Sequence, residues 1–420
     1  MTTRVRGVKG TRDLLPEETA VWAAVEAVAR KVFGSYGYGE IRTPIMEETE
    51  LFVRGVGEST DIVGKEMYTF PDRKGRSLTL RPESTAPVAR AFVQHGMADR
   101  GLPVKVYYAG PQFRYERPQR GRYRQFSQIG AELIGDPGPS SDAELLLMLV
   151  RFLEALEFDG LTVLLNTVGD EASRAAYRTA LLEFLEPHRE SLGEDSRRRL
   201  ETNPLRILDT KNPAERELLT DAPGLEDHLT DESREHFDAV RAALDACGVR
   251  YRVEPRLVRG LDYYSRTVFE IVAAGLGAQD AIVGGGRYDG LIADLGGADV
   301  PAIGFAIGQD RLLEALPESF RSAQSVPRPV HLVGAGGVSS TAILELAEWF
   351  RGEGLDLVTE FGGRSVKAAM RRADKSGARW VLLVGDEEMS SREVSLRDLG
   401  AGEQERLGYE AAAARIKESS

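Results

Sequence analysis

Five arginines lie close together in the first third of the chain, and their side chains suit the binding of phosphate groups. Arg114, Arg117, Arg120, Arg122 and Arg124 occupy a stretch of eleven residues. A guanidinium group presents planar, forked donors that match the geometry of phosphate oxygens. Solvated hairpin loops also carry arginines on alternate residues, so this cluster alone leaves both interpretations open.

The segment RPEST at 81–85 could receive an ammonium group. Glu83 offers a carboxylate and Thr85 a hydroxyl, next to a rigid Arg-Pro pair. The same residues are also typical of a helix start, in which Ser84 or Thr85 caps the helix and Glu83 lies in its first turn. For this segment taken alone we favour the helix start.

A denser segment, LVRGLDYYSRTVFEI at 257–271, combines two arginines with two adjacent tyrosines. These residues are Arg259, Tyr263, Tyr264 and Arg266, and their flanks are rich in β-formers. Adjacent tyrosines on a strand point to opposite faces, so only one of them need enter a pocket. Taken alone, the segment could also be an ordinary aromatic strand.

Two glycine-rich segments follow, GGGRYDGL at 284–291 and GFAIGQDR at 304–311. The first lacks the spacing of known phosphate-binding glycine loops, so its glycines more simply permit close backbone approach beside a pocket. The second indicates a helix packed tightly on a strand, with Arg311 one turn inside the helix. Arg311 could project over a ligand or pair with a nearby acid such as Glu314.

Basic residues form a stripe near the end of the chain. Arg364, Lys367, Arg371 and Lys375 recur at spacings of three, four and four residues, which places them on one side of a helix. A solvated helix face is the usual explanation of such a stripe. The more specific alternative is a surface that contacts the backbone of a nucleic acid.

The elements that must position these residues follow from periodicity and turn residues. We expect a helix over 17–33 after Pro16, and two strands over 105–116 and 124–135 joined by the arginine-rich loop. A helix over 140–156 should begin with Ser140 or Ser141 as its N-cap.

Farther along the chain, the pattern of expected helices and strands changes twice. Residues 170–248 are helical, charged and polar, as in an inserted subdomain. Residues 302–316 indicate a strand, a tight glycine turn and a helix. After a proline- and serine-containing segment, residues from 330 onward alternate between strand and helix, which predicts a small α/β domain with helices against a mixed sheet.

Composition excludes several classes of protein. The 420 residues carry 54 basic and 66 acidic side chains, a net charge of −12, which argues against a general nucleic-acid coat. The one cysteine, Cys247, excludes an intramolecular disulfide and a cysteine-rich zinc site. No apolar stretch is long enough for a membrane helix and the start has no signal-peptide core, so we expect a cytoplasmic protein without membrane attachment.

The order and spacing of the segments carry more information than any one of them. Together they closely resemble histidyl-tRNA synthetase, a class II aminoacyl-tRNA synthetase family, from about residue 7 to 315 and more loosely beyond. Pro44, Arg114 and Arg311 match the landmarks of the three class II motifs. The segments are KGTRDLLP, GYGEIRTPIMEETELF, RPEST, FRYERPQRGRYRQFSQIGAE, LVRGLDYYSRTVFEI, GGGRYDGL and GFAIGQDRLL.

The resemblance implies an α+β fold, in which an antiparallel sheet is flanked by helices. On this basis residues 1–169 and 251–316 form the catalytic core, and residues 170–250 form a helical insertion domain. Residues 317–329 are the linker, and residues 330–420 form a C-terminal α/β anticodon-binding domain. The family is a homodimer, and the segment around Pro44 builds its interface.

The implied activity is the ligation of histidine to its tRNA. Histidine reacts with ATP to give histidyl-adenylate and pyrophosphate, and histidine is then transferred to the 3′ end of tRNA(His). Arg114 and Arg259 would stabilise the α-phosphate on its two sides. ATP would further contact Glu116, Phe126 and Arg311. Magnesium should accompany the β- and γ-phosphates, and no protein-bound zinc or other metal is implied.

The resemblance also assigns residues to histidine and to tRNA. Glu83, Thr85 and Gln128 would take the ammonium group, and Glu132 and Tyr264 would contact the imidazole, with Tyr263 beside them. The acceptor end of the tRNA would meet Arg117, Gln119 and Arg124. The anticodon stem would meet the stripe of Arg364, Lys367, Arg371 and Lys375.

The sequence departs from the family pattern at two positions, with Ser84 in place of glycine and Ser127 in place of histidine. Ser127 alternates with Phe126 and Gln128 on a strand, so it should face away from the ligand. The main alternative is a non-catalytic, histidine-sensing regulatory subunit of ATP phosphoribosyltransferase. Such paralogues usually lack the C-terminal domain. A synthetase for another amino acid, such as proline or threonine, would not explain the segments at 257–271 and 284–291.

Overall fold

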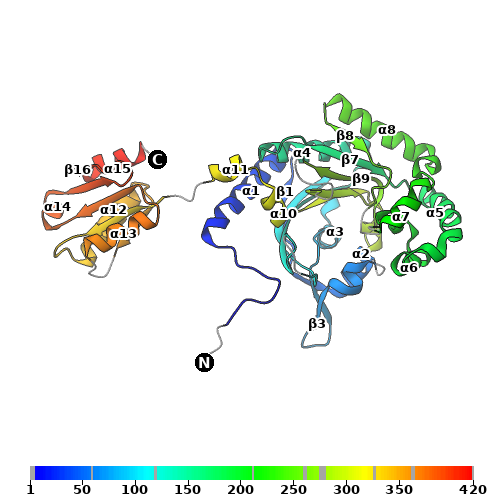
Figure 1. Ribbon diagram of the computed structural model, residues 1–420, viewed down its shortest axis with the longest axis horizontal. Coiled ribbons are helices and arrows are strands. Elements are labelled where there is room, and N and C mark those ends of the chain that lie inside the picture. The colour runs from blue at the N-terminus through cyan, green and yellow to red at the C-terminus, as the bar shows by residue number, and fades with distance from the viewer. Residues whose placement is uncertain are drawn as a thin grey trace. The chain divides into compact units, whose positions relative to one another are not determined.

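The computed structural model describes residues 5–57, 60–117, 121–210, 212–258, 263–273, 281–324, 328–360 and 365–418. The chain divides into two compact units, Met1–Gln324 and Ser325–Ser420 (Figure 1). Gln119, Arg259 and Arg364, for which roles are predicted above, lie outside the described residues.

A curved, mainly antiparallel sheet forms the centre of the first unit. Within its described part, eight strands pair in the order β1-β5-β6-β11-β10-β9-β7-β8. Only β1 with β5 and β7 with β8 run parallel among these pairs. The predicted α+β class with an antiparallel sheet is therefore confirmed. The strands are β1 Gly39–Glu40, β5 Val104–Phe113, β6 Gln125–Ile134, β7 Thr162–Thr167, β8 Tyr251–Val253, β9 Ser265–Val272, β10 Val283–Arg287 and β11 Ala302–Gly308.

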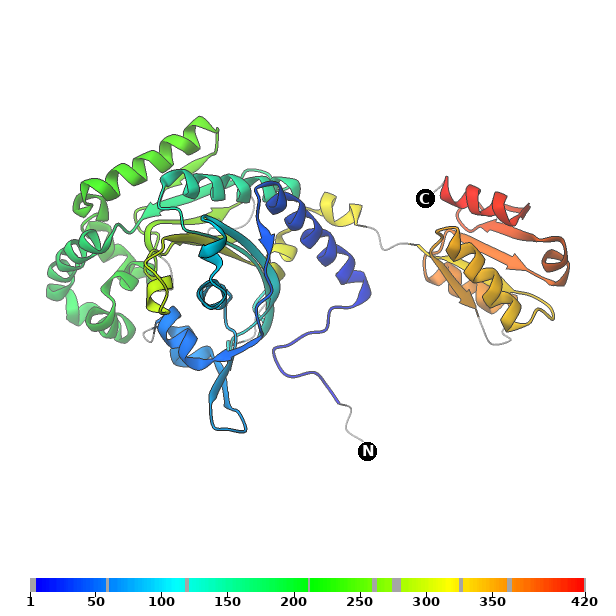
Figure 2. The same ribbon diagram turned by 180° about the vertical axis from the view of Figure 1, so that it is seen from behind.

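Helices cover both faces of this sheet, because strand side chains alternate between two apolar clusters. Tyr107 packs with α1, α4, α8 and α10, whereas Tyr108 packs with α3 and α9 on the other face. Figures 1 and 2 show α1 on the outer side of the curved sheet and α3 within its curve. These helices are α1 Pro16–Ser35, α3 Thr85–Gln94, α4 Pro139–Ala155, α8 Asp231–Ala246, α9 Leu291–Asp294 and α10 Gln309–Ala315.

A small second sheet projects from the first unit. Its described strands pair antiparallel in the order β2-β4-β3, and α2 packs beside them. The β3–β4 hairpin extends away from the main sheet (Figures 1 and 2). These elements are β2 Met46–Glu48, α2 Thr49–Val56, β3 Tyr68–Pro71 and β4 Ser77–Leu80.

The predicted helical insertion contains a separate apolar cluster. Helices α5 Glu171–Leu185, α6 Glu194–Thr202 and α7 Pro213–Leu218 surround it, and Leu181 and Leu185 at its centre are fully buried. Helix α8 comes from the same stretch of sequence but packs on α4 in the main core, because its apolar face carries Phe237 and Leu244.

Two helix starts differ from the expectations. Helix α4 begins at Pro139 after Gly138, not at a capping serine, because proline at the first helical position needs no partner for a missing N–H. Helix α3 has Ser84 in the N-cap position, yet the Ser84 side chain makes no capping bond.

The segment predicted as a linker also contains a helix. Within it, Glu318–Ala323 form α11, because Phe320 packs into the main core.

The second unit is the predicted α/β domain with a mixed sheet. Its described strands pair in the order β13-β12-β14-β15-β16, parallel among the first three and antiparallel afterwards. Helices α12 and α15 pack on one face and α13 on the other. The strands are β12 Val330–Gly334, β13 Leu357–Glu360, β14 Trp380–Val384, β15 Glu393–Asp398 and β16 Gln404–Gly408. The helices are α12 Ser340–Gly352, α13 Val366–Lys375, α14 Asp386–Ser391 and α15 Tyr409–Lys417. Across the described ranges, we find no helix with the length and apolar character that crossing a membrane requires.

Candidate functional site

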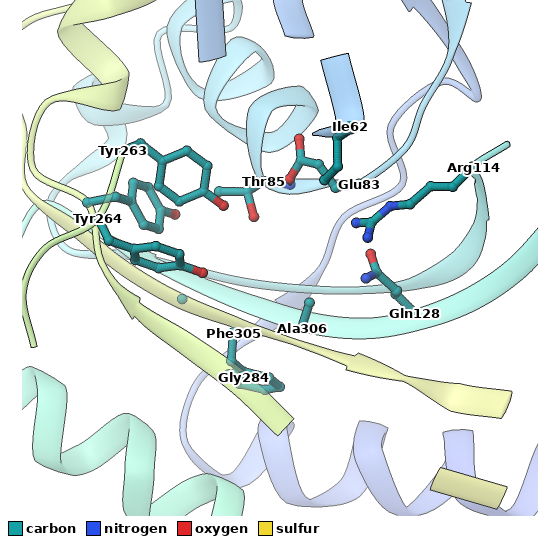
Figure 3. Close-up of a pocket in the computed structure, with 12 residues that line it drawn as sticks. Ile62, Glu83, Thr85, Arg114, Gln128, Tyr263, Tyr264, Gly284, Phe305 and Ala306 are labelled. Atoms are coloured by element: carbon teal, nitrogen blue, oxygen red, sulfur yellow. The ribbon is translucent and has the colours of Figure 1, made fainter. Parts of the chain in front are cut away.

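A cavity of about 200 Å³ opens in the first unit between the main sheet and α3 (Figure 3). Half of its lining residues are among those predicted from the sequence. The sheet contributes its floor through strands β6, β10 and β11, and the start of α3 contributes the opposite wall. The lining residues are Ile62, Glu83, Thr85, Arg114, Gln128, Tyr263, Tyr264, Gly284, Tyr288, Gly304, Phe305 and Ala306.

Glu83 caps helix α3 and also faces the cavity. Its Oε2 accepts a hydrogen bond from the backbone N–H of Thr85 at 2.6 Å, and its Oε1 accepts one from Ala86 at 3.0 Å. Burial raises the pKa of the Glu83 carboxyl, although these N–H groups and the charge of Arg114 oppose the rise. The expected capping by Ser84 or Thr85 is therefore wrong. The Glu83 carboxylate caps the helix start that was favoured for RPEST, and it also lies where it could receive an ammonium group.

The Ser84 hydroxyl has a different partner. It accepts a hydrogen bond of 2.7 Å from Nε2 of Gln112, whose side chain is fully buried on β5. The added bulk of serine at this position therefore fits beside the cavity, because a buried amide on the neighbouring strand bonds to it.

Glu132 lies beneath the cavity floor and anchors a buried polar network. Its Oε1 accepts hydrogen bonds from Thr85 Oγ1 at 2.9 Å and Tyr108 Oη at 3.4 Å, and its Oε2 accepts one from Tyr288 Oη at 2.5 Å. Burial raises the pKa of Glu132 to about 8, while these hydroxyl groups partly oppose the rise. Gly304 leaves room for this carboxylate, because a Cβ there would lie 1.6 Å from Glu132 Oε2.

Tyr108 and Tyr288 are absent from the residues singled out in the sequence. Tyr288 lies in the GGGRYDGL segment, whose interpretation depended on its glycines and not on its tyrosine. Tyr108 could have been found from strand alternation, because it lies on the same face of β5 as Val106, the residue paired with Glu132 on β6.

Both predicted tyrosines line the cavity, although strand alternation required only one of them to enter a pocket. Tyr263 and Tyr264 precede β9 instead of belonging to it, so strand alternation does not separate them. Their ring centroids lie 4.8 Å apart, and Tyr263 also packs edge-on against Tyr288 at 5.5 Å. The three rings form one aromatic wall.

Arg114 occupies the other end of the cavity, at the end of β5 (Figure 3). Its Nε donates to the carbonyl oxygen of Pro82 at 2.8 Å, and its guanidinium carbon lies 5.4 Å from the centroid of the Phe126 ring. Gln128 lies two residues beyond Phe126 on β6, and its Oε1 is buried without a hydrogen-bond partner among the described residues. An incoming N–H donor would satisfy this atom.

The arginine-rich loop lies beside the start of α10. A Cβ at Gly121 would lie 3.1 Å from Cγ of Arg311, so the loop and this arginine are in contact distance, while Arg311 is not among the lining residues. Arg124 stacks on Tyr115 at 3.9 Å from the ring centroid. Arg117 is exposed.

Two carboxylates lie near Arg114. Glu116 forms an ion pair of 3.7 Å with Arg122, and Glu66 is electrostatically coupled to both Glu116 and Arg114. Burial, and secondarily the charge of Glu116, raise the pKa of Glu66. Among the described residues, no three histidine, cysteine or acidic side chains are grouped so that they could hold a metal ion.

The basic stripe lies on α13 of the second unit. Lys367, Arg371 and Lys375 are exposed there. The neighbouring Arg372 pairs with Glu360 at 3.0 Å, so it is not equivalent to the stripe residues.

Both units match families of known proteins. Residues 10–312 match the family model for histidyl-tRNA synthetase, and residues 333–419 match the model for an anticodon binding domain. An apo histidyl-tRNA synthetase from S. aureus is 35% identical, with a TM-score of 0.82 over 99% of this chain and 100% of that chain.

Two more distant structures share the fold. Histidyl-tRNA synthetase from Nostoc sp. PCC 7120 is 21% identical, with a TM-score of 0.71 over 99% of this chain and 100% of that chain. A protein from Bacillus halodurans C, named as an ATP phosphoribosyltransferase regulatory subunit/histidyl-tRNA synthetase, is 24% identical. Its TM-score is 0.68 over 92% of this chain and 100% of that chain.

Proposed function

Because the chain belongs to the histidyl-tRNA synthetase family, we propose that it is a histidine–tRNA ligase. It activates histidine with ATP, releases pyrophosphate and transfers histidine to the 3′ end of tRNA(His). The observation that carries this proposal is the cavity itself. A buried carboxylate, Glu83, and a cation, Arg114, face the same space, as a substrate with an ammonium group and a reacting phosphate requires.

Arg114 would act on the first chemical step. The histidine carboxylate oxygen attacks the α-phosphorus, and the bond to pyrophosphate breaks while negative charge spreads over the equatorial oxygens. A cation that is already held in place stabilises this charge without reorganisation. The Pro82 carbonyl and the Phe126 ring hold Arg114 in this way. We place Arg259 on the opposite side of the phosphate, by resemblance to the family.

The remaining nucleotide contacts follow from the surroundings of Arg114. Phe126 would cover one face of the adenine, and Arg311 would stack on the other and reach the γ-phosphate. Glu66 and Glu116 fit a magnesium ion that arrives with ATP, because they are oxygen donors whose mutual repulsion a divalent cation relieves. When bound, the ion neutralises charge on the β- and γ-phosphates.

Histidine recognition would use both ends of the amino acid. Glu83, Thr85 and the unpartnered Oε1 of Gln128 would accept the ammonium hydrogens. Tyr264 and Glu132 would contact the two imidazole nitrogens, with Tyr263 packed against them. A site that must satisfy two polar nitrogens rejects apolar side chains strongly, because its own polar groups would otherwise remain unpaired.

Transfer to tRNA would involve both units. We place the acceptor end at Arg117, Gln119 and Arg124. We place the anticodon stem at the stripe that runs from Arg364 to Lys375, in the unit that matches the anticodon binding domain. We further propose a cytoplasmic homodimer with Pro44 at its interface. The neighbouring Ile45 and Met46, which are 44% and 52% exposed in the single chain, support this surface.

A second candidate is the histidine-sensing regulatory subunit of ATP phosphoribosyltransferase. The likeness to the Bacillus halodurans C protein, whose name includes that regulatory subunit, favours keeping it. The arginine in the cavity and the C-terminal unit that matches the anticodon binding domain model favour the ligase.

ATP–pyrophosphate exchange with each of the twenty amino acids supplied singly separates these candidates. We expect exchange with histidine alone. Tight histidine binding without exchange would establish the regulatory alternative. Exchange with another amino acid would overturn the assignment of Glu132 and Tyr264 to the imidazole.

A further inference from the structure

Arg266 has a backbone conformation that is unusual for its residue type. Its φ of 49° lies in the left-handed region, where glycine is the unstrained choice. The residue sits in a β-bulge, because Gly286 pairs with Val268 whereas the adjacent Arg287 pairs with Ser265, which leaves two residues of β9 unmatched. A bulge redirects the chain beside it. Here the chain beside it is Tyr264, which lines the cavity.

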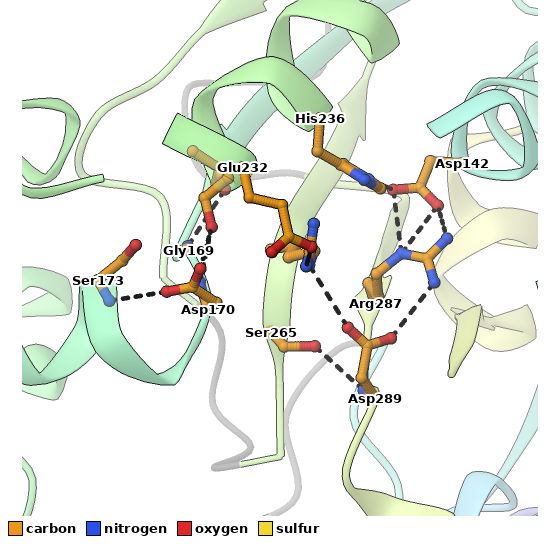
Figure 4. Close-up of polar contacts among 12 residues, drawn as sticks. Asp142, Gly169, Asp170, Ser173, Glu232, His236, Ser265, Arg287 and Asp289 are labelled. Atoms are coloured by element: carbon orange, nitrogen blue, oxygen red, sulfur yellow. Dashed lines mark hydrogen bonds and ion pairs between the residues drawn. The ribbon is translucent and has the colours of Figure 1, made fainter. Parts of the chain in front are cut away.

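The Arg266 side chain joins two elements that lie far apart in sequence. Its Nη2 donates to Oε1 of Glu232 on α8 at 2.5 Å, and its Nε lies 3.8 Å from Oδ2 of Asp289. The Arg266 side chain is 18% exposed and the Glu232 side chain 75%, so solvent screens this pair in part. Asp289 in turn donates its backbone N–H to the Ser265 hydroxyl at 3.1 Å (Figure 4).

The insertion helices also contact the backbone around Arg266. The N–H of Arg266 donates to the carbonyl oxygen of Gly169 at 2.8 Å, just before α5 begins. From α5 itself, Nη1 of Arg174 donates to the carbonyl oxygen of Tyr264 at 2.6 Å. The Tyr264 backbone is therefore held between α5 on one side and the Arg266 contacts to α8 on the other.

The Tyr264 ring has little freedom to compensate for a shift of this backbone. A Cβ at Gly286 would lie 2.8 Å from Cδ1 of Tyr264, so the ring rests directly on the glycine backbone of β10. The Tyr263 ring also packs against it, at a centroid distance of 4.8 Å. Because the ring position depends on where its backbone is held, a change at Arg266 is transmitted to the cavity wall.

We infer that Arg266 is a positioning residue for histidine recognition, an inference that rests on the proposed function. It does not line the cavity and touches no reacting atom. Its ion pairs to Glu232 and Asp289 hold the strained bulge, and the bulge sets Tyr264 against the imidazole. Through Arg174 on α5 and Glu232 on α8, the positions of these two helices contribute to the affinity for histidine.

The test measures histidine binding by calorimetry, without ATP or tRNA, on the full chain. Arg266→Gly removes the side chain but tolerates the positive φ, and we expect the histidine Kd to rise about tenfold or more. Glu232→Gln removes one exposed partner only, so we expect a rise of about two- to fivefold, as for a single partly screened ion pair. Glu235→Gln, an equal charge change one turn farther along the exposed side of α8, should leave the Kd unchanged.

A role in positioning predicts a particular kinetic pattern. In ATP–pyrophosphate exchange, Glu232→Gln should raise the KM for histidine and leave kcat and the KM for ATP within about twofold of the original values. In a Tyr264→Phe background, Arg266→Gly should add much less than its effect in the original chain, because both changes act through one side chain.

Three results would overturn the inference. They are an unchanged histidine Kd in both Arg266→Gly and Glu232→Gln, equal losses of histidine and ATP affinity, or effects of Tyr264→Phe and Arg266→Gly that multiply. Loss of fold in Arg266→Gly would show in its thermal transition, and Glu232→Gln then carries the test. Failure of the proposed function is distinguishable. Histidine binding without exchange would refute the ligase and leave this inference standing, whereas no histidine binding by the original chain would refute both.

Discussion

The hydroxyl of Tyr288 donates to Oε2 of Glu132 at 2.5 Å, beneath the floor of the cavity. Two residues 156 positions apart in the chain thus meet across the sheet. Together with Thr85 and Tyr108, they form a network in which three hydroxyl groups converge on one buried carboxyl group. Its protonation state follows from burial, which raises the pKa of Glu132 to about 8.

This raised pKa predicts how stability depends on pH. Between the ordinary value of 4.5 and about 8, the folded state holds a proton that the unfolded state releases. The contribution of Glu132 to the free energy of unfolding is therefore complete below pH 4.5 and declines as pH rises toward 8. Urea unfolding across this range should show the decline in the original chain and lose it in Glu132→Gln. Equal slopes in both proteins would contradict the prediction. Glu154→Gln, at an exposed position of α4, is the control.

Gly304→Ala should disrupt the same network by sterics. The new Cβ would lie 1.6 Å from Glu132 Oε2 and 2.8 Å from the Ala131 carbonyl oxygen, and the backbone atom cannot move away. We expect a loss of stability of about 1–3 kcal/mol, typical of overpacking, and weaker histidine binding. Gly308→Ala on the same strand is the matched control, because its Cβ would meet no described atom within 4 Å. Equal behaviour of the two variants in urea unfolding would refute this explanation.

Arg287 and Asp142 form a fully buried ion pair, and Asp142 Oδ2 also lies 2.9 Å from Nε2 of His236 (Figure 4). Burial opposes ionisation, but the His236 hydrogen bond and the Arg287 charge lower the pKa of Asp142. Asp142→Asn should remove the buried counter-charge of Arg287 and leave only the partly exposed Asp289, whose Oδ1 lies 3.3 Å from Nη1. We therefore expect a loss of stability of about 3 kcal/mol in urea unfolding, at the lower end for breaking a buried pair.

The double variant Asp142→Leu/Arg287→Met distinguishes charge from packing at this site. Replacing a whole buried pair with apolar residues is often neutral, so it should recover much of the loss. A double variant no more stable than Asp142→Asn would show that shape, not the unpaired charge, dominates. Because the lowered pKa favours the folded state above the ordinary value of 3.8, this contribution should disappear as pH falls below that value.

The stripe on α13 should affect tRNA binding and not amino-acid activation. Substituting Lys367, Arg371 or Lys375 with alanine should weaken tRNA binding. Each lost phosphate contact should reduce the slope of log affinity against log salt by about 1. ATP–pyrophosphate exchange should not change, because these side chains lie in the second unit. Lys417→Ala on α15 is the control. An unaltered salt slope in all three variants would show that the stripe is only a solvated helix face.

The fold class was predictable because apolar periodicity is local. The helical pattern over 17–33 corresponds to α1, and the paired β-rich segments correspond to β5 and β6. The alternation after residue 330 corresponds to the second unit. Helix α8 shows the limit of this reasoning. Its charged sequence resembles the rest of the insertion, but its buried Phe237 finds its partners on α4, which sequence periodicity does not reveal.

Half of the residues that line the cavity were predicted, but through the order of short segments that resembles the family and not through any one segment alone. Glu83 and Thr85 stand two positions apart, and Arg114 and Gln128 lie on or beside the paired strands β5 and β6. The exceptions arise where the backbone leaves regular geometry. Both Tyr263 and Tyr264 enter the wall because β9 begins only at Ser265.

The pattern of residue types was therefore sufficient for most of the elements and their order, whereas the cavity residues were predicted from the resemblance to the histidyl-tRNA synthetase family. Tertiary contacts were needed for the pairs that join distant segments: Tyr288 with Glu132, Arg287 with Asp142, and Arg266 with Glu232. The physical reason is that a helix or strand buries one face, and the spacing of apolar residues that this requires can be seen within a few neighbouring residues. Partners of a buried charge, by contrast, depend on strand register, a bulge and helix packing, which arise only when the whole chain has folded.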